Sequence, residues 1–212
     1  MEVYILNVPK RQERRDSVMQ EFHGKDCFST HIITPVNHSI PRVSHWLSFL
    51  QLTQHANAEG LDCFVFCEDD HTFTEHFEEQ SFLCLVEEAS QLKADVLIGG
   101  VSWMATSVQV SDGLFWLDKF NGTQFVIIFS RFYDKILASN WNENNVVTDF
   151  HISENSENIF VTFPFISIQK DFGYSDVTAF NNAKGYVTGL FDGTFKGLQI
   201  LDKVRSFYHG LQ

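Results

Sequence analysis

Three consecutive carboxylates, Glu68, Asp69 and Asp70, directly follow the apolar run 63–67. A short apolar run bounded by polar residues is typical of a strand buried on both faces, as in a parallel sheet covered by helices. The carboxylates then lie at the carboxyl end of that strand, the edge where open α/β sheets bind ligands. Adjacent carboxylates repel one another unless a cation or a set of hydrogen-bond donors holds them. Carboxylate oxygens suit Mg²⁺ or Mn²⁺, whose shells are completed by phosphate oxygens and water, so the triplet predicts a metal-assisted site for a phosphorylated substrate.

The alternative for such a triplet is a solvated acidic loop. The ligand site is favoured because Phe64 to Cys67 are all apolar, so that the carboxylates emerge directly from the core. If the strand stays extended through the triplet, Glu68 and Asp70 share one side and Asp69 points to the other.

Other residues that could take part in chemistry are scattered. Four of the six residues 10–15 are cationic, and they follow the first apolar run, where a negatively charged small ligand could bind. The sequence lacks GxGxxG, GxxxxGK[ST], GxSxG and HExxH, the signatures of dinucleotide sites, P-loops, α/β-hydrolases and zinc proteases. His71 and His151 stand near acidic residues that could raise their pKa values or share a metal ion with them.

Strand and helix patterns alternate along the chain, which predicts a single α/β domain over residues 1–212 with a mixed, mostly parallel sheet flanked by helices. Strands are expected at 3–8, 31–35, 63–67, 95–99, 124–129 and 159–168. Helices are expected at 11–22, 45–59, 75–92, 132–139 and 198–208, the second with Ser44 as its N-cap. Antiparallel strands with a turn at Asp112-Gly113 are expected within 101–117, and a loop with one helical turn around Asp149 within 141–157.

The composition indicates a globular protein that does not bind nucleic acid. Of its 212 residues, 44% are hydrophobic and 20% are charged, which is typical of a folded domain. The formal net charge of −12 argues against binding of nucleic acid, or of anionic lipid through the bulk surface. We find no signal peptide and no membrane span, and the four cysteines lack zinc spacing, so the expected location is the reducing cytoplasm.

An ordered set of short motifs resembles the family 25 glycosyltransferases, which assemble bacterial lipopolysaccharide and related glycans and include enzymes that galactosylate collagen. The motifs are, in chain order, Leu6-Asn7-Val8, Arg11 and Arg14, Ser44-His45-Trp46, Val65 to Asp70, Val96 to Gly99, Gly122-Thr123, Thr148-Asp149, and Pro164 through Gln169 to Ser175-Asp176-Val177. They cover the chain to about residue 180 and leave 185–212 outside the match. The chain departs from the family in two places. It has Leu6-Asn7-Val8-Pro9 where the family reads Ile-Asn-Leu, with Asp before its arginines, and it has Gln124-Phe125 in place of the aromatic residues that follow the family's Gly-Thr pair.

The resemblance implies a GT-A-type fold and a hexosyltransferase that moves a sugar, commonly galactose from UDP-galactose, to a glycan acceptor with inversion. A divalent cation, Mn²⁺ or Mg²⁺, neutralises the charge that develops on the leaving pyrophosphate in such enzymes. By similarity, Asp70 is the direct metal ligand, Asp69 holds the ribose or binds the metal through water, and Glu68 supports both.

Donor binding is expected of Asn7, Arg11 and Arg14, which follow the first strand, because arginines can make bidentate contacts with phosphate. Ser44 and His45 belong to a matching motif and are expected on the donor side as well. Taken without the resemblance, His45 is a structural residue near a helix start.

Inversion requires a general base that takes the proton of the acceptor hydroxyl. The resemblance makes Asp149 the first candidate and Asp176 the second, because both lie in late motifs where the acceptor side of such folds is built. The alternative for each is an aspartate in a solvated loop. His151 is a candidate for a further metal ligand.

Two other functions remain open for this sequence. One is a metal-dependent phosphohydrolase, which the triplet allows but the other motifs do not explain. The other is a non-catalytic protein of the same fold that binds nucleotide-sugars or glycans. If the protein is a transferase, its acceptor is a lipopolysaccharide or surface oligosaccharide, and a lipid-linked acceptor would bring it to the inner face of the membrane as a peripheral protein.

Overall fold

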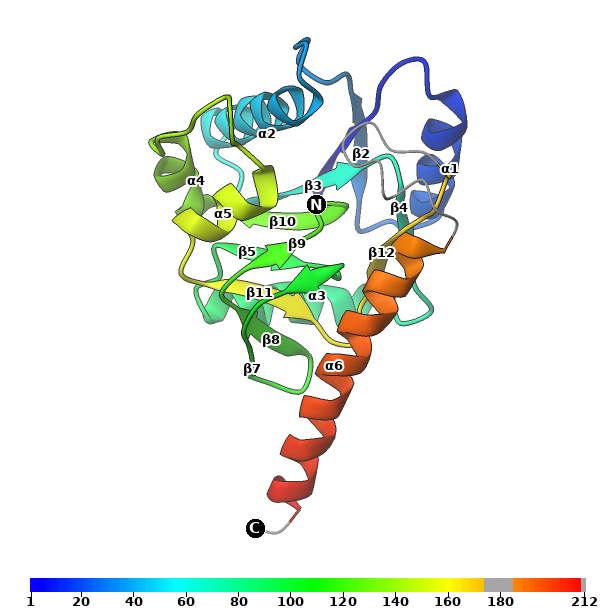
Figure 1. The fold of residues 1–212 in the computed structure, drawn as a ribbon, viewed down its shortest axis with the longest axis vertical. Helices are drawn as coiled ribbons and strands as arrows, with labels where there is room; N and C mark the ends of the chain where they lie inside the picture. Colours follow the sequence, from blue (N-terminus) through cyan, green and yellow to red (C-terminus); the bar gives the residue numbers. More distant parts are fainter. Residues whose placement is uncertain (174–184, 211–212) are drawn as a thin grey trace.

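The computed structural model of the protein describes residues 1–173 and 185–210. Its centre is a sheet in the strand order β2-β1-β3-β10-β5-β11-β8-β7 (Figure 1). The bounds of these strands are β1 Glu2–Leu6, β2 Ser29–Ile33, β3 Cys63–Glu68, β5 Val96–Ile98, β7 Ser107–Gln109, β8 Leu114–Leu117, β10 Phe125–Phe129 and β11 Ile159–Thr162. β10 and β8 run antiparallel to both of their neighbours, whereas the other strands of this sheet share one direction. The expected mixed, mostly parallel sheet is confirmed.

Helices cover both faces of the sheet (Figure 1). The helices are α1 Gln12–Phe22 and α3 Glu79–Gln91 on one face, and α2 Pro41–Ala58, α4 Ser130–Leu137, α5 Thr148–Asn155 and α6 Tyr186–His209 on the other. In β3, Phe64 and Phe66 belong to the core under α2, while Val65 and Cys67 belong to the core under α1 and α3. Because side chains alternate along a strand, this run is buried on both faces, as its composition predicts.

Two short ribbons border the edge at which β3 ends. β4 (His71–Phe73) follows the carboxylate triplet and pairs with β12 (Ser167–Gln169). β9 (Phe120–Asn121) precedes β10 and pairs with β6 (Trp103–Met104). The ribbons thus bring chain from three distant parts of the sequence to the end of β3.

The start of α2 differs from the expectation. The helix begins at Pro41 and not at His45, with Ile40 at the N-cap position, so the assignment of Ser44 as N-cap is wrong. Proline fits the first turn because its missing N–H would have no partner inside the helix there. The Ser44 hydroxyl instead donates to the Val36 carbonyl, 2.5 Å away.

Three other bounds also differ. α3 begins at Glu79 and not at 75, because the Glu78 carboxylate caps it by accepting from the backbone N–H groups of Gln80 and Ser81 at 3.0 and 2.6 Å. The expected strand 159–168 is two strands, β11 and β12, because the chain leaves the sheet at Phe163-Pro164. The expected helical turn around Asp149 is the helix α5. β1, β2, β3, β5 and β10 lie within two residues of their expected bounds.

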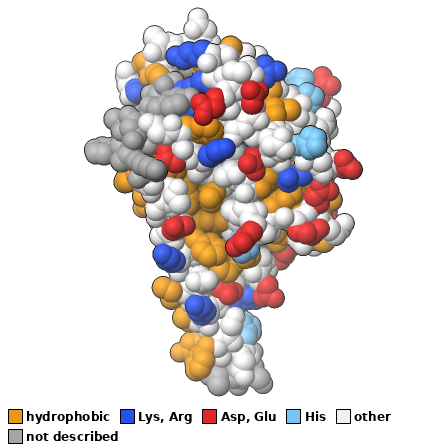
Figure 2. Space-filling model, turned by 90° about the vertical axis from the view of Figure 1, so that its right-hand side faces the viewer, with side chains coloured by type: hydrophobic (Ala, Val, Ile, Leu, Met, Phe, Trp, Pro, Cys, Tyr) orange, Lys and Arg blue, Asp and Glu red, His pale blue; other side chains and the backbone are white. Residues whose placement is uncertain are grey.

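α6 begins at Tyr186 and is twelve residues longer at its start than the expected helix 198–208. Its first half packs on the sheet through Val187, Phe191 and Leu198. Its second half extends beyond the body, and hydrophobic side chains lie on the surface of this tapering end (Figure 2). No helix within the described ranges is both long enough and apolar enough to cross a lipid bilayer.

Candidate functional site

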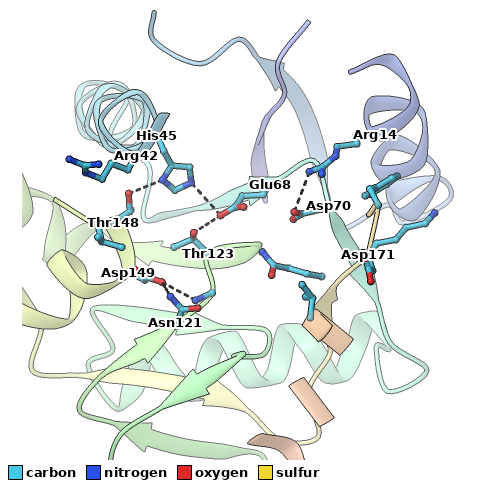
Figure 3. Close-up of a pocket in the computed structure, with 16 residues that line it drawn as sticks. Arg14, Arg42, His45, Glu68, Asp70, Asn121, Thr123, Thr148, Asp149 and Asp171 are labelled. Carbon is cyan, nitrogen blue, oxygen red and sulfur yellow. Dashed lines mark hydrogen bonds and ion pairs between the residues drawn. The ribbon is translucent and has the colours of Figure 1, made fainter. Parts of the chain in front are cut away.

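Two adjoining pockets lie at the carboxyl end of β3, and Figure 3 shows the larger of the two. They share Arg14, His45, Glu68 and Asp70 and therefore meet at the carboxylates. The larger one, here called the main pocket, is also lined by Arg42, Asn121, Gly122, Thr123, Val147, Thr148, Asp149, Gln169, Lys170, Asp171, Phe172 and Val187. The other, here called the side pocket, is also lined by Leu6, Val8, Arg11, Pro35, Pro41, Ser44 and Asp69. As the alternation of a strand predicts, Glu68 and Asp70 line the main pocket and Asp69 does not.

Asp69 lies among donors from the chain that follows β1. Its Oδ2 accepts from Asn7 Nδ2 at 2.9 Å and lies 3.9 Å from Arg11 Nη1. Its Oδ1 accepts from Arg14 Nη1 at 3.2 Å. Burial raises the pKa of Asp69, and the positive charge of Arg14 opposes that rise. The structure thus brings Asn7, Arg11 and Arg14 to Asp69, which follows Asn7 by 62 residues in the sequence.

Glu68 lies between α2 and the loop that leads into β10. Its Oε1 is 3.2 Å from His45 Nε2 and also accepts from the hydroxyl of Thr123. His45 Nδ1 lies 2.7 Å from the Thr148 hydroxyl on α5, so the imidazole bridges β3 and α5. Burial alone would raise the pKa of Glu68, but the contacts with His45 and Thr123 outweigh it and lower that pKa.

Among the three carboxylates of the triplet, Asp70 has the fewest hydrogen-bond partners within the described residues. Its Oδ2 lies 3.4 Å from Arg14 Nη1, and its buried Oδ1 has no hydrogen-bond partner among residues 1–173 and 185–210. Burial, and next the charge of Glu68, raise the pKa of Asp70 well above its ordinary value.

A divalent cation fits this donor set through Asp70. Within the described ranges, no three His, Cys, Asp or Glu side chains are grouped so as to hold a metal ion by themselves. Mg²⁺ is commonly bound by one or two carboxylates together with substrate phosphates and water, and such a shell needs only the open oxygen of Asp70 and a phosphorylated ligand. The Asp69 oxygens, in contrast, already accept from Asn7 and Arg14.

Asp149 lies across the main pocket from the triplet, in the first turn of α5 (Figure 3). Its Oδ2 accepts from Asn121 Nδ2 at 2.6 Å and from the backbone N–H of Gly122 at 3.1 Å, and its Oδ1 accepts from the N–H of Phe150 at 2.9 Å. Gly122 has a φ of 126°, a conformation that favours glycine. Burial raises the pKa of Asp149, and the two backbone donors oppose the rise. A buried carboxylate with a raised pKa that faces a pocket can serve as a general base.

His151 does not reach the carboxylates. Its Nε2 lies 3.0 Å from the Ser139 hydroxyl, and its ring packs edge-on against Trp46 at 4.7 Å between centroids. Residues two positions apart on a helix point in nearly opposite directions, so His151 faces the core while Asp149 faces the pocket. His151 lines neither pocket, and its role as a metal ligand stays a prediction.

The remaining expected residues have different places. His71 is buried, with Nδ1 2.8 Å from the Ser167 hydroxyl, and burial lowers its pKa to about 3. Ser44 lines the side pocket, although its hydroxyl bonds within the protein. Asp176 lies outside the described residues.

Several pocket residues lacked a sequence signal. Asn121 lies outside the Gly122-Thr123 motif, and its contact with Asp149 depends on the β6–β9 ribbon. Phe172 packs under the guanidinium of Arg14, whose Cζ is 4.8 Å from the ring centroid. Arg42 at the opposite rim donates to the Asn144 carbonyl at 3.0 Å. Only tertiary structure brings these residues to the triplet.

Comparison with known proteins gives a fold and no family. No protein-family model and no curated protein matches the sequence. Among solved structures, A197 from STIV is 13% identical, with a TM-score of 0.53 over 80% of this chain and 84% of that chain. UDP-glucose pyrophosphorylase complexed with UDP-glucose is 9% identical, with a TM-score of 0.48 over 92% of this chain and 81% of that chain. A glycosyltransferase involved in the glycosylation of the major capsid of PBCV-1 is 10% identical, with a TM-score of 0.47 over 76% of this chain and 80% of that chain. The chain therefore shares the α/β fold of A197.

Proposed function

We propose that the protein is a nucleotide-sugar-dependent glycosyltransferase that moves a hexose, galactose in the first instance, from a UDP-sugar to a glycan acceptor with inversion. The observation that carries the proposal is that Glu68 and Asp70 of the triplet line the same pocket as the buried carboxylate of Asp149. Such a transferase needs a charged end for the diphosphate and a base for the acceptor hydroxyl. The resemblance to family 25 supports the same assignment.

The arginines on the donor side are held in place before any ligand binds. Arg11 and Arg14 both lie within 4 Å of Asp69, and guanidinium groups suit the paired oxygens of a diphosphate. The side pocket beyond them has an apolar lining that suits a flat base such as uracil, from Leu6, Val8, Pro35 and Pro41. We therefore assign the diphosphate to the arginines and the uridine to the side pocket.

Asp70 would hold Mn²⁺ or Mg²⁺ together with the donor phosphates. When bound, such an ion neutralises the charge that develops on the leaving nucleoside diphosphate. Glu68 keeps its carboxylate in contact with His45 and Thr123, and we assign it a supporting role beside Asp70.

Asp149 is the proposed general base. It takes the proton of the acceptor hydroxyl as that oxygen bonds to the anomeric carbon, while the bond from this carbon to the phosphate oxygen breaks and UDP leaves with the electron pair. Amide donors hold both of its oxygens, which fixes the carboxylate without giving it a positive partner at bonding distance. Asp176 remains the second candidate.

For the acceptor we propose a lipopolysaccharide or surface oligosaccharide. A lipid-linked acceptor would place the reaction in the cytoplasm, at the inner face of the membrane. This part of the proposal rests on the family resemblance alone.

Calorimetric titration of UDP into the protein, once with Mn²⁺ and once with a chelator, tests the donor site. The same titrations with GDP and CMP give the affinities for comparison. We expect UDP to bind more tightly than GDP or CMP, and only with the metal. Asp70→Asn should lose the metal-dependent part of this affinity, whereas Asp112→Asn, at an exposed turn, should keep it. Equal binding of UDP by the Asp70 variant and the unaltered protein would contradict the metal assignment, and absence of any nucleotide binding would contradict the donor site.

A further inference from the structure

Two large aromatic side chains lie exposed and in contact beside Asp149. Trp103 is 46% exposed and Phe150 is 39% exposed, although most aromatic residues of this protein are buried. Their ring centroids are 6.1 Å apart and their planes are nearly perpendicular, at 85°. Trp103 comes from β6 and Phe150 from α5, so the pair joins two elements that are distant in the sequence.

Each ring is tied to the candidate base by one short connection. Phe150 follows Asp149 directly, and its backbone N–H donates to Asp149 Oδ1 at 2.9 Å. Trp103 is paired with Asn121 across the β6–β9 ribbon, and Asn121 Nδ2 donates to Asp149 Oδ2 at 2.6 Å. Directly opposed residues of an antiparallel pair place their side chains on the same face. The indole of Trp103 therefore stands beside the Asn121 amide, on the face of the ribbon that carries the contact with Asp149.

We infer that Trp103 and Phe150 form a platform on which the acceptor sugar stacks, so that one of its hydroxyl groups is presented to Asp149. This inference rests on the proposed function. One face of a pyranose ring carries weakly positive C–H groups, and an aromatic ring carries negative charge on its face, so the two attract. The sugar hydroxyls at the edge of the stacked ring remain free for polar contacts such as those of Asn121 and Asp149.

The position of the aromatic pair favours the acceptor sugar over the nucleotide-sugar donor as its ligand. Arg14, Glu68 and Asp70 lie across the main pocket from Asp149, to which the pair is connected, and they suit a charged diphosphate (Figure 3). The platform contributes no charge, so it suits a neutral sugar. Another exposed aromatic pair, Phe207 and Tyr208, lies near the far end of α6, away from both pockets, and provides a matched control.

Saturation-transfer NMR with neutral saccharides tests the platform directly. Lactose, maltose and methyl β-D-galactopyranoside are each added to the protein with saturating UDP and Mn²⁺, and the transfer to their C–H protons is measured. We expect transfer to at least one of them, a fall of about tenfold in Trp103→Ala, a smaller fall in Phe150→Leu, and retention of most of the signal in Trp103→Phe. Phe207→Ala should match the unaltered protein.

Two results would overturn the platform. One is the absence of transfer to all three saccharides in the unaltered protein. The other is equal transfer in the unaltered protein and in Trp103→Ala, with folding of the variant checked by its thermal melt. Failure of the proposed function is read separately, from calorimetry of UDP on the same samples. Saccharide binding that depends on Trp103 without any UDP binding would keep the platform and contradict the donor site.

Discussion

The two sides of the candidate site hold their aspartates by different chemistry: Asp69 lines the side pocket and Asp149 lines the main pocket. On one side, Asp69 is held by the cationic side chain of Arg14 and by Asn7, with Arg11 close by. On the other side, Asp149 is held by amide groups alone, from Asn121, Gly122 and Phe150. Burial raises both pKa values, but an ion pair opposes the rise chiefly at Asp69 and backbone hydrogen bonds oppose it chiefly at Asp149.

The difference indicates a division of labour. A carboxylate that fixes arginines prepares a site for a polyanion. A carboxylate held only by neutral amides keeps its basicity, and can accept a proton from a neutral substrate. We therefore expect variants of the ionic side to change nucleotide affinity and variants of the amide side to change turnover.

The largest effect is expected for Asp149→Asn. Loss of a general base costs about a hundredfold to ten-thousandfold in rate, so transfer from the UDP-sugar should fall by about a thousandfold. The Kd for UDP should stay within about twofold, because Asp149 is not on the ionic side. Steady-state transfer and UDP calorimetry give the two numbers. A variant that keeps most of its activity would remove Asp149 from the mechanism and favour Asp176.

A smaller effect, on affinity alone, is expected for Arg14→Lys. Lysine keeps the charge but loses the fork of donors that matches paired phosphate oxygens, so the Kd for UDP should rise by about tenfold. The control is Arg15→Lys, because Arg15 is exposed on the same helix and lines neither pocket. If both variants bind UDP like the unaltered protein, the ionic side is not the diphosphate site.

Gly122→Ala should lower turnover through geometry. An added Cβ would lie 2.9 Å from Gln124 Oε1, and the φ of 126° disfavours any residue but glycine. We expect a destabilisation of about 1–3 kcal/mol and a fall in transfer rate of about tenfold as the backbone donor to Asp149 moves. Gly24→Ala is the control, since Gly24 also has a positive φ, of 75°, but lies outside both pockets. An equal loss of rate in both variants would mean that strain alone, and not the contact with Asp149, is responsible.

The smallest expected effect is a shift in the pH profile. Because burial raises the pKa of Asp149, its carboxyl becomes protonated, and inactive as a base, at a higher pH than an ordinary aspartate. The acid limb of the pH profile of kcat/KM should therefore lie at a higher pH than an ordinary aspartate would give. The charge of His45 lowers the pKa of Asp149 and the charge of Glu68 raises it. Asn121→Ala removes a donor that favours the charged form, so it should move the limb to still higher pH. Asn144→Ala, in an exposed loop, should leave it in place, and a downward shift in Asn121→Ala would contradict this account.

The parts of the site that the sequence predicts are those governed by local rules. The apolar run before Glu68 identifies a strand buried on both faces, and the carboxylates must then lie at its end. Arg11 and Arg14 follow the neighbouring parallel strand β1 and therefore reach the same edge. The amide side depends on long-range pairing of β6 with β9 and of Asn121 with α5, which no local pattern encodes.

The differences between the expected and the observed positions have local physical reasons as well. The glycines 189, 193 and 197 lower helix propensity, so the sequence pattern does not predict the first half of α6. Burial of Phe191 and Leu198 stabilises the helix in the folded protein. His151 is close to Asp149 in sequence, but the turn of α5 points its ring into the core.

The most direct test of the central claim is turnover of a UDP-hexose followed by proton NMR. The protein is incubated with Mn²⁺, a saccharide acceptor and, in turn, UDP-galactose and UDP-glucose, whose sugars are α-linked. We predict that UDP and a β-linked glycoside appear in equal amounts with at least one donor. Cleavage of the donor to UMP and hexose 1-phosphate without a glycoside would indicate a phosphohydrolase. Absence of any turnover with intact UDP binding would indicate a non-catalytic binding protein, and either result would contradict the account.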